Sequence, residues 1–298
     1  MSFKILSSGI FSTIQDQGRY GFNHLGITHS GAIDEYAYGW SQKLLGQKNI
    51  NAIELMVGLK LEVLKEIEIS VTGADLGFKI NQKLSPIWQS YSIRKGDVLT
   101  FSKRVSGQRA YLAVKNGFIC EQKYGSCATT LKENIGFKIK RGDILETYSD
   151  FKRSTIFRLK KELIPNYEKP LTLRLLLSYQ DDYFLTEEKE KFFNSEYQVT
   201  LESDRMGFKL KGQAIFPKKG GIISEGIAFG SVQIPKNGQP IVLLKERQTI
   251  GGYPKIGTVL AVDCFSLAQI SIGSMVRFKA IEIEEAQEIM RDYLALFT

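Results

Sequence analysis

Apolar and polar residues alternate along most of the chain, and this pattern predicts β-strands. Ile67, Ile69 and Val71 are separated by polar residues, and a Thr-Gly-Ala-Asp turn follows at residues 72–75. Residues 171–178 repeat the alternation with a row of leucines. Side chains with a period of two lie on opposite faces of a strand. Short segments of this kind, separated by Gly, Asn and Asp, favour a sandwich or barrel over alternating strands and helices.

Apolar residues at helical spacing predict three helices, over residues 33–45, 186–194 and 284–297. The first ends at Gly46, and either Ser30 or Asp34 is expected to cap its start. The last helix carries an apolar stripe that we interpret as core packing. Its members are Ala286, Ile289, Met290, Tyr293, Leu294 and Phe297.

One phrase occurs three times: an apolar residue, a glycine turn and an outgoing strand, starting at Ile93, Ile139 and Ile270. Its position near the end of each half indicates two β-rich domains of related design. Residues 148–169 are polar and charged, which is typical of a linker. We therefore predict an N-terminal domain over residues 1–150, followed by the linker and a C-terminal domain over residues 151–298.

The bulk composition is that of a globular protein with a substantial core. Of 298 residues, 43% are hydrophobic and 24% are charged, and no apolar run reaches the roughly 20 residues that span a bilayer. The first residues lack the apolar stretch and cleavage site of a secretion signal. Three cysteines without C-x-x-C spacing favour reduced thiols, a cytoplasmic location and no structural zinc.

The net charge of +8 raises the question of nucleic acid, but the basic residues are scattered. The chain has no Arg/Lys block, no aromatic-basic RNA motif and no helix-turn-helix pattern. We expect a solvated basic surface that can attract small anions. Nucleic acid and membrane partners are not expected.

Polar, glycine-rich stretches at residues 13–34, 71–75, 203–212 and 224–257 are the candidates for chemistry. The first contains both histidines, His24 and His29, which we interpret as surface-loop residues. Catalysis is therefore expected to depend on carboxylates, Arg, Lys and backbone amides. Neither a Walker loop nor a dinucleotide-binding glycine motif is present.

Each stretch allows a functional and a purely structural interpretation. The amides after Ser30 and Gly31 would form an anion site at a helix start, or Ser30 simply caps the helix. Asp16 and Arg19 would form a turn ion pair or bind substrate. Arg205 could hold a carboxylate or phosphate, or it could belong to an ordinary turn.

The last stretch leaves similar alternatives open. Glu225 lies between small residues and could be a general base, a metal ligand or an ordinary turn acid. Gly251 and Gly252 could form a sharp turn that exposes amides to an anion. Glu246, Arg247 and Lys255 would then flank this turn.

The long motifs of these stretches together resemble the family of 5-oxoprolinase C subunits. The matching phrases are TIQDQGRYGFNHLGITHSGAID, VTGAD, GQRAYLAV, SDRMGFKLKG, SEGIAFGSVQIPKNGQPIVL and RQTIGGYPKIGTV. The resemblance covers residues 9–278 and extends to allophanate hydrolase second-subunit-like and biotin-dependent carboxyltransferase-like proteins. It implies two cyclophilin-like β-barrel domains in a mainly β chain with a few helices.

This chain departs from the family pattern at four places. Ser178 and Tyr179 precede Gln180 where the family commonly has Gly-Pro-Gln, and Cys127 stands where it has arginine. Glu246 replaces an aspartate before Arg247, and an asparagine of the first helix is glutamine at position 42.

The resemblance implies a protein that acts with separate A and B subunits to hydrolyse 5-oxo-L-proline to L-glutamate at the expense of ATP, with Mg²⁺. The first alternative is a carboxyltransferase module that accepts carboxyl from carboxybiotin onto urea or a similar amide. It would need a separate carrier, because the chain has no Met-Lys-Met biotin attachment sequence. The second alternative is a non-catalytic regulatory partner of a kinase inhibitor that resembles the B subunit.

On the first interpretation, cations stabilise phosphoryl charge and carboxylates handle protons. The catalytic candidates are Glu225, Arg247, Lys255, Arg205 and Asp34, with Glu246 as a further acid. The candidates for cofactor binding are Ser30, Gly31, Gly251 and Gly252. The candidates for substrate binding are Asp16, Arg19, Asp75, Asp204, Glu246, Gln248, Thr249 and Tyr253. No metal ligands can be named.

Overall fold

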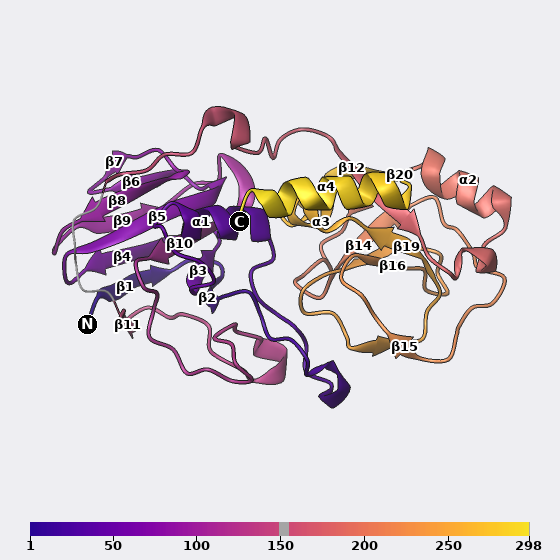
Figure 1. The fold of residues 1–298 in the computed structure, drawn as a ribbon, viewed down its shortest axis with the longest axis horizontal. Coiled ribbons are helices and arrows are strands. Elements are labelled where there is room, and N and C mark those ends of the chain that lie inside the picture. The colour runs from indigo at the N-terminus through magenta and orange to yellow at the C-terminus, as the bar shows by residue number, and fades with distance from the viewer. Residues whose placement is uncertain (149–154, 298) are drawn as a thin grey trace. The chain divides into compact units, whose positions relative to one another are not determined.

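The computed structural model describes residues 1–148 and 155–297, which form two compact units (Figure 1). Unit 1 consists of Met1–Arg19 and Ser30–Glu168, and unit 2 of Tyr20–His29 and Lys169–Thr298. The expected boundary between residues 150 and 151 lies outside the described residues. One short segment, Tyr20–His29, belongs to unit 2 although its neighbours on both sides belong to unit 1. None of the helices described is long and apolar enough to cross a membrane.

The described part of unit 1 consists of two antiparallel sheets, one α-helix, α1 (Glu35–Lys43), and short 3-10 turns. The larger sheet has the order β11 (Ile144–Leu145), β1 (Phe3–Ser8), β4 (Leu59–Val63), β9 (Val98–Phe101), β6 (Phe78–Ile80) and β7 (Lys83–Leu84). The other has the order β2 (Ser12–Gln15), β3 (Ala52–Leu55), β10 (Ser106–Val114), β5 (Ile67–Asp75) and β8 (Gln89–Ile93). Buried apolar residues of both sheets form one core.

Unit 2 is a closed barrel of seven strands. Around the barrel these are β12 (Leu171–Leu177), β19 (Lys255–Val259), β16 (Ser231–Gln233), β17 (Ile241–Leu243), β14 (Gly207–Gly212), β13 (Glu196–Val199) and β20 (Met275–Ala280). A separate ribbon pairs β15 (Glu225–Gly226) with β18 (Ile250–Gly251). The helices of unit 2 are α2 (Thr186–Asn194), α3 (Ala261–Leu267) and α4 (Ile283–Ala295). The mainly β class expected from the sequence is confirmed.

Strand β5 is buried on both faces, whereas its alternating sequence predicted one buried face and one exposed face. Ile67, Ile69 and Val71 are fully buried, as expected. The intervening polar residues are buried too, because α1 covers the second face of the sheet. Ser70 Oγ donates to the Ser41 carbonyl at 2.6 Å and Thr72 Oγ1 to the Ala37 carbonyl at 2.7 Å. These hydroxyls fasten the helix to the sheet without leaving an unpaired polar group.

The repeated glycine turn is confirmed in its three positions. Gly96, Gly142 and Gly273 all have φ between 86° and 95°, in the left-handed region that favours glycine. In the first two copies an aspartate closes the turn. Asp97 accepts from the Arg94 amide at 2.7 Å, and Asp143 accepts from the Lys140 amide at 2.8 Å.

Helix α4 is packed less completely than its sequence suggested. Of its apolar stripe only Ala286 is buried, while Leu294 is 56% exposed, so core packing is wrong as a description of the whole stripe. Helix α3 was not expected, because its seven residues are too few to establish a helical period.

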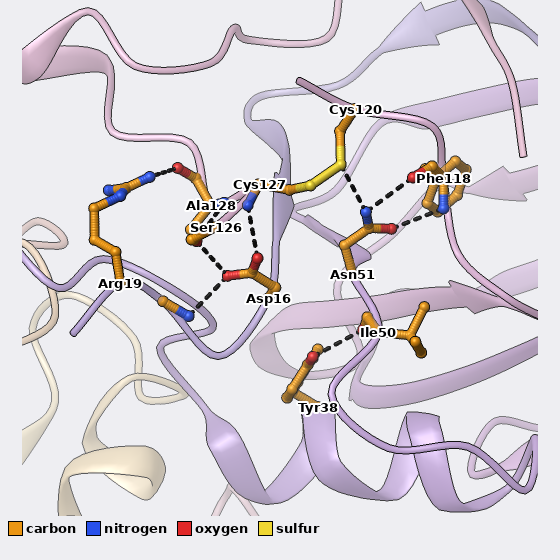
Figure 2. Close-up of a disulfide and its surroundings, with 11 residues drawn as sticks. Asp16, Arg19, Tyr38, Ile50, Asn51, Phe118, Cys120, Ser126, Cys127 and Ala128 are labelled. Atoms are coloured by element: carbon orange, nitrogen blue, oxygen red, sulfur yellow. Dashed lines mark hydrogen bonds between the residues drawn. A yellow bond between two sulfur atoms is a disulfide. The ribbon is translucent and has the colours of Figure 1, made fainter. Parts of the chain in front are cut away.

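Cys120 and Cys127 form a disulfide in unit 1 (Figure 2), which the expectation of reduced cysteines excluded. Their Cα atoms are 6.0 Å apart, and Cys264 remains a buried free thiol. A spacing of seven residues is uninformative in sequence, because only the fold shows that the two side chains meet. The cysteine count therefore no longer argues for a reducing compartment.

The disulfide can be tested by counting thiols. Alkylation of the unfolded, unreduced chain should label one cysteine, Cys264, and alkylation after dithiothreitol should label three, as intact mass will show. Labelling of three cysteines without reductant would contradict the assignment. The double variant Cys120→Ser/Cys127→Ser should lose about 2 kcal/mol in free energy of unfolding, because the closed loop is short.

Candidate functional site

The structure divides the predicted site residues between the two units. Unit 1 contains Asp16, Arg19, Ser30, Gly31, Asp34 and Asp75. Unit 2 contains Asp204, Arg205, Glu225, Glu246, Arg247, Gln248, Thr249, Gly251, Gly252, Tyr253 and Lys255. Within each unit, hydrogen bonding separates residues that maintain the fold from those with capacity left for a ligand.

The expected anion site after Ser30 is not a helix start. Helix α1 begins at Glu35, and Asp34 is its N-cap, accepting from the Ala37 amide at 3.0 Å. The amides of Ala32 and Ile33 donate to the Asp16 carbonyl and to Glu54 Oε2. The expectation that these amides point outward is therefore wrong, because the helix starts later and the protein itself binds them.

Asp34 and Ser30 have structural partners as well. Asp34 is 1% exposed and also accepts a hydrogen bond from the Tyr167 hydroxyl at 3.0 Å. Ser30 Oγ donates to the Thr129 carbonyl at 3.0 Å, and Ser30 has a φ of 51°. Ordinary packing explains both residues without catalysis, and the role of Ser30 and Gly31 toward a cofactor stays a prediction without this geometric support.

Asp16 and Arg19 were expected to form a turn ion pair or to bind substrate. The hydrogen bonds of both side chains instead include residues 126–130. The Asp16 carboxylate accepts from the Gly18 amide, Ser126 Oγ and the Cys127 amide, each at 2.7 Å (Figure 2). Arg19 donates to the Ala128 carbonyl and to Thr130 Oγ1. These bonds order the loop next to the disulfide.

Two further aspartates close turns. Asp75 accepts from the Gly77 amide at 2.9 Å, and Asp204 accepts from the Met206 amide at 2.8 Å. Both are side-chain turns of the kind that aspartate forms with the backbone two residues on. Their geometry supports the structural alternative.

Arg205 and Glu246 form a buried ion pair. Arg205 Nε lies 2.5 Å from Glu246 Oε1, and the side chains are 7% and 9% exposed. The Glu246 amide also donates to the Arg205 carbonyl at 2.9 Å. The glutamate that departs from the family's aspartate thus neutralises the arginine of another loop. Each residue is the other's partner before any ligand binds.

Glu225, Lys255 and Gln180 form a polar cluster beside the β15–β18 ribbon. Glu225 Oε1 accepts from Lys255 Nζ, and from Gln180 Nε2 at 2.6 Å. The Gln180 carbonyl oxygen accepts from the Lys255 amide at 2.9 Å, which fixes the start of β19. The hydrogen bond from Lys255 lowers the pKa of the Glu225 carboxyl, assisted by Tyr179. Glu225 is therefore ionised at neutral pH, which makes it a weak general base.

The cluster is open to solvent on the side of Glu225. The Glu225 side chain is 32% exposed, whereas that of Lys255 is 7% exposed. Tyr179, which is 75% exposed, has its ring 6.0 Å from Lys255 Nζ. The buried ammonium thus lies beside a carboxylate and an aromatic ring that are both accessible to solvent.

Gln233 lies next to Lys255 of this cluster through strand pairing. It lies opposite Lys255 in the pairing of β16 with β19, so that the two side chains share a face. Within the described residues, Gln233 Nε2 is buried and has no hydrogen-bond partner. A buried donor without a partner costs free energy, which is tolerated where a ligand uses the donor.

Gly251 belongs to strand β18, so the expected Gly-Gly turn is wrong. A Cβ atom at this position would lie 2.6 Å from Ile227 Cδ1 and 2.7 Å from Gln233 Nε2. A side chain at position 251 would displace the ends of these two side chains, because the ribbon passes directly over Gln233. The neighbouring Gly252 carbonyl accepts from the Ile222 amide at 2.9 Å.

Arg247 lies in the loop after β17 and is 5% exposed. Its Nε donates to the Ile227 carbonyl at 2.9 Å and its Nη1 to the Leu244 carbonyl at 3.2 Å, while Nη2 lies 3.3 Å from His29 Nδ1. Burial lowers the pKa of Arg247 to about 10, so the guanidinium stays protonated at neutral pH. Burial and the cations Arg247 and Lys245 lower the pKa of His29.

The other candidates of this stretch provide less chemistry. Gln248 is exposed, and Thr249 contributes its carbonyl to the Ile227 amide at 3.2 Å. Tyr253 is 42% exposed. Their roles toward a substrate stay predictions. In the described residues no group of three His, Cys, Asp or Glu side chains could hold a metal ion.

Sequence reasoning missed Gln180, Tyr179, Gln233, Lys245 and the role of His29. Gln180 and Tyr179 belong to a tripeptide that departs from the family pattern, and that departure was a usable signal. Gln233 gave no signal, because an unpaired amide can be recognised only in a structure. His29 lies 218 residues from Arg247, so their contact has no trace in local spacing.

The buried Arg205–Glu246 pair predicts a large effect on stability. Arg205→Ala should lower the free energy of unfolding in urea by about 3–5 kcal/mol, because it strands a buried carboxylate. Lys209–Glu202 is a matched control with the same 2.5 Å separation, but its side chains are 49% and 72% exposed. Lys209→Ala should cost less than about 1 kcal/mol. Similar losses from both variants would contradict the proposed importance of burial.

Comparison with known proteins identifies the family of the chain. Residues 25–280 match the family described as carboxyltransferase domain, subdomain A and B. The chain is 34% identical to the C subunit of 5-oxoprolinase from Haemophilus influenzae, over 94% of this chain and 91% of that protein. It is 33% identical to the C subunit of 5-oxoprolinase from Escherichia coli, over 99% of this chain and 96% of that protein.

A solved structure confirms the fold. The chain superimposes on the K. lactis urea amidolyase with a TM-score of 0.92 and 21% identity, covering 99% of this chain and 20% of that one. At this identity the likeness shows the architecture alone, which is the fold class that the sequence resemblance implied. From the family match and the two nearly full-length relatives, we conclude that the chain belongs to the carboxyltransferase domain family, in its branch of 5-oxoprolinase C subunits.

Proposed function

We propose that this chain is the C subunit of an ATP-dependent 5-oxoprolinase, which with the A and B subunits hydrolyses 5-oxo-L-proline to L-glutamate. The observation that carries the proposal is the match to two proteins named as 5-oxoprolinase C subunits along nearly their whole length. The names of these relatives also imply that such chains act as parts of a larger enzyme. The polar cluster of Glu225, Lys255 and Gln180, together with Gln233, supplies hydrogen-bond donors for a lactam carbonyl.

The lactam carbonyl oxygen would accept hydrogen bonds from Lys255 Nζ and Gln233 Nε2. Both donors are on one face of the β16–β19 pair, and Gln233 Nε2 has no protein partner among the described residues. Donors that are already in place stabilise negative charge on oxygen when water adds to the carbonyl carbon. Glu225 holds the ammonium in position through their ion pair.

Glu225 is better suited to positioning than to taking a proton. Its pKa is lowered, so its affinity for a proton at neutral pH is small. In the proposal Glu225 fixes Lys255 and orients the attacking water. Of the alternatives for Glu225, the proposal accordingly replaces the general base with a positioning role.

ATP would supply the free energy that lactam hydrolysis requires. Lys255 and Arg247 are buried cations of the type that binds phosphate oxygens, so the residues present are compatible with an anionic co-substrate. The described residues include no acidic cluster for Mg²⁺. We therefore propose that the metal ligands come from the nucleotide and from the other subunits.

The activity is tested by reconstitution. This chain alone should release no glutamate from 5-oxoproline, whereas the chain mixed with the A and B subunits should release it only with ATP. Copurification of the B subunit with a tagged form of this chain is the first measurement, and the glutamate assay is the second. ATP-dependent glutamate release that is equally fast without this chain would exclude the proposal.

The residue roles give a second test in the reconstituted complex. Lys255→Met should lower kcat about 10²–10³-fold, the usual effect of losing a donor to a developing oxyanion. Lys211→Met, at an exposed position of β14, is the matched control and should leave kcat unchanged. Normal kcat in Lys255→Met would remove Lys255 from the mechanism.

Gln233→Leu distinguishes function from stability. Because the Gln233 amide nitrogen has no partner among the described residues, its removal should preserve or raise the free energy of unfolding while kcat falls. Gln180→Leu, which loses hydrogen bonds to Glu225 and the Lys255 amide, should lower that free energy. A loss of stability in Gln233→Leu as large as that in Gln180→Leu would contradict the unused-donor interpretation.

A carboxyltransferase is the second candidate, favoured by the description of the matching family. In that case the same donors would polarise the carbonyl of urea or a similar amide, and carboxybiotin on a separate carrier would deliver the carboxyl group. Turnover would then require bicarbonate, a biotin carboxylase and the carrier. Glutamate release without these components favours the oxoprolinase.

A further inference from the structure

The three successive charged residues after β17 are Lys245, Glu246 and Arg247, and each has different contacts. Glu246 pairs with Arg205, as described above. Lys245 is 5% exposed and has its Nζ 4.9 Å from the centre of the Phe229 ring. Arg247 is equally buried but bonds to backbone carbonyls and His29. Glu246, which lies between the two cations in the sequence, is therefore neutralised by Arg205 of another loop.

Arg247 has no carboxylate partner within the described part of the chain. Its Nε donates to the Ile227 carbonyl and its Nη1 to the Leu244 carbonyl. One N–H of Nη2 faces His29 Nδ1. A guanidinium has five N–H donors, so further donors remain on the terminal nitrogens. Asp263, which like Arg247 acts on the pKa of the Cys264 thiol, accepts three hydrogen bonds from Arg174.

Lys245 and Arg247 act on a common region. Both lower the pKa of His29, and both oppose the rise that burial causes in the pKa of the Cys264 thiol. Two buried positive charges therefore act on both His29 and Cys264. Removing a charge from water costs several kcal/mol unless an opposite charge or strong hydrogen bonds compensate. The carbonyl partners of Arg247 compensate only in part, because they carry no net charge.

His29 provides the connection to solvent. Its ring is half-buried, and Tyr20, which is 58% exposed, packs on it with ring centres 4.8 Å apart. The segment Tyr20–His29 belongs to unit 2, although the chain on either side of it belongs to unit 1. This detour places an imidazole nitrogen against the guanidinium of a loop more than 200 residues away.

We propose that Arg247, Lys245 and His29 form a binding site for an oxyanion, which on the proposed function is the carboxylate of 5-oxoproline. A planar guanidinium with spare donors is suited to a carboxylate or a phosphate, and the adjacent ammonium supplies a second positive charge. This identification of the ligand rests on the proposed function. The site itself rests on the buried guanidinium of Arg247, which neutral groups compensate only in part.

The two histidines of the chain make a direct test possible without any enzymatic assay. In the full-length chain the NMR signals of the imidazole ring protons follow the titration of His29, and His24→Gln assigns them. Free His29 should titrate below its ordinary pKa because burial and two cations disfavour its protonated form. A bound anion opposes the effect of the cations, so the pKa should rise.

Three probes separate the sources of the anion. 5-Oxoproline should raise the pKa of His29 in a saturable way, while 2-pyrrolidinone, which has the same lactam without the carboxylate, should not. Inorganic phosphate serves as the third probe. Saturable effects of phosphate with none of 5-oxoproline would retain an oxyanion site and overturn its assignment to the substrate carboxylate.

Two variants test the residues. Arg247→Gln should raise the pKa of free His29 and weaken 5-oxoproline binding about tenfold or more, the equivalent of one charge-assisted hydrogen bond. Lys245→Met should act in the same direction and serves if Arg247→Gln does not fold. Arg277→Gln, an exposed position on β20, is the control and should change neither value.

Absence of any His29 shift with 5-oxoproline and phosphate, or equal shifts with 2-pyrrolidinone, would overturn the proposal. Failure of the reconstituted complex to release glutamate would not alter this titration. The two outcomes therefore remain distinguishable, because one measures anion binding to this chain and the other measures turnover by the complex.

Discussion

Burying a charge is the physical constraint on which the candidate site depends. Unit 2 removes Lys245, Glu246, Arg247 and Lys255 from water within or just after its barrel strands. The protein compensates two of these charges directly, through the Glu246–Arg205 and Lys255–Glu225 pairs. Around Arg247, neutral carbonyls and an imidazole take the place of a carboxylate. That difference is the reason why we propose an anion site at Arg247 rather than at Arg205.

Unit 1 shows the opposite situation. Its polar motifs, which looked equally catalytic in the sequence, use much of their capacity on the protein itself. Asp34 caps α1, Asp16 binds the loop beside the disulfide, and the amides of Ala32 and Ile33 have acceptors within the same unit. Such networks specify one backbone arrangement because every buried polar group must find its partner. Glycine and polar residues in a loop therefore do not by themselves identify a site.

The barrel brings the remaining chemistry together by strand pairing. Register places Gln233 opposite Lys255, and the β15–β18 ribbon carries Glu225 and Gly251 over them. A side chain at position 251 would occupy the space between the ribbon and Gln233. Two departures from the family pattern make contacts in this unit: Tyr179 lies beside Lys255, and Glu246 pairs with Arg205.

The amino-acid sequence was enough to predict the mainly β class, the helices around residues 35–43, 186–194 and 283–295, the three repeated glycine turns and the family. These are local or cumulative signals, since periodicity and turn residues depend on near neighbours and a family depends on long ordered motifs. Which charges are neutralised became clear from the three-dimensional arrangement of the side chains. The Cys120–Cys127 disulfide, the Arg205–Glu246 pair, the His29–Arg247 contact and the Gln233 amide, unpartnered among the described residues, depend on which side chains meet in space. Sequence spacing contains no record of that, because hydrogen bonds and ion pairs act over a few ångströms whatever the length of chain between the partners.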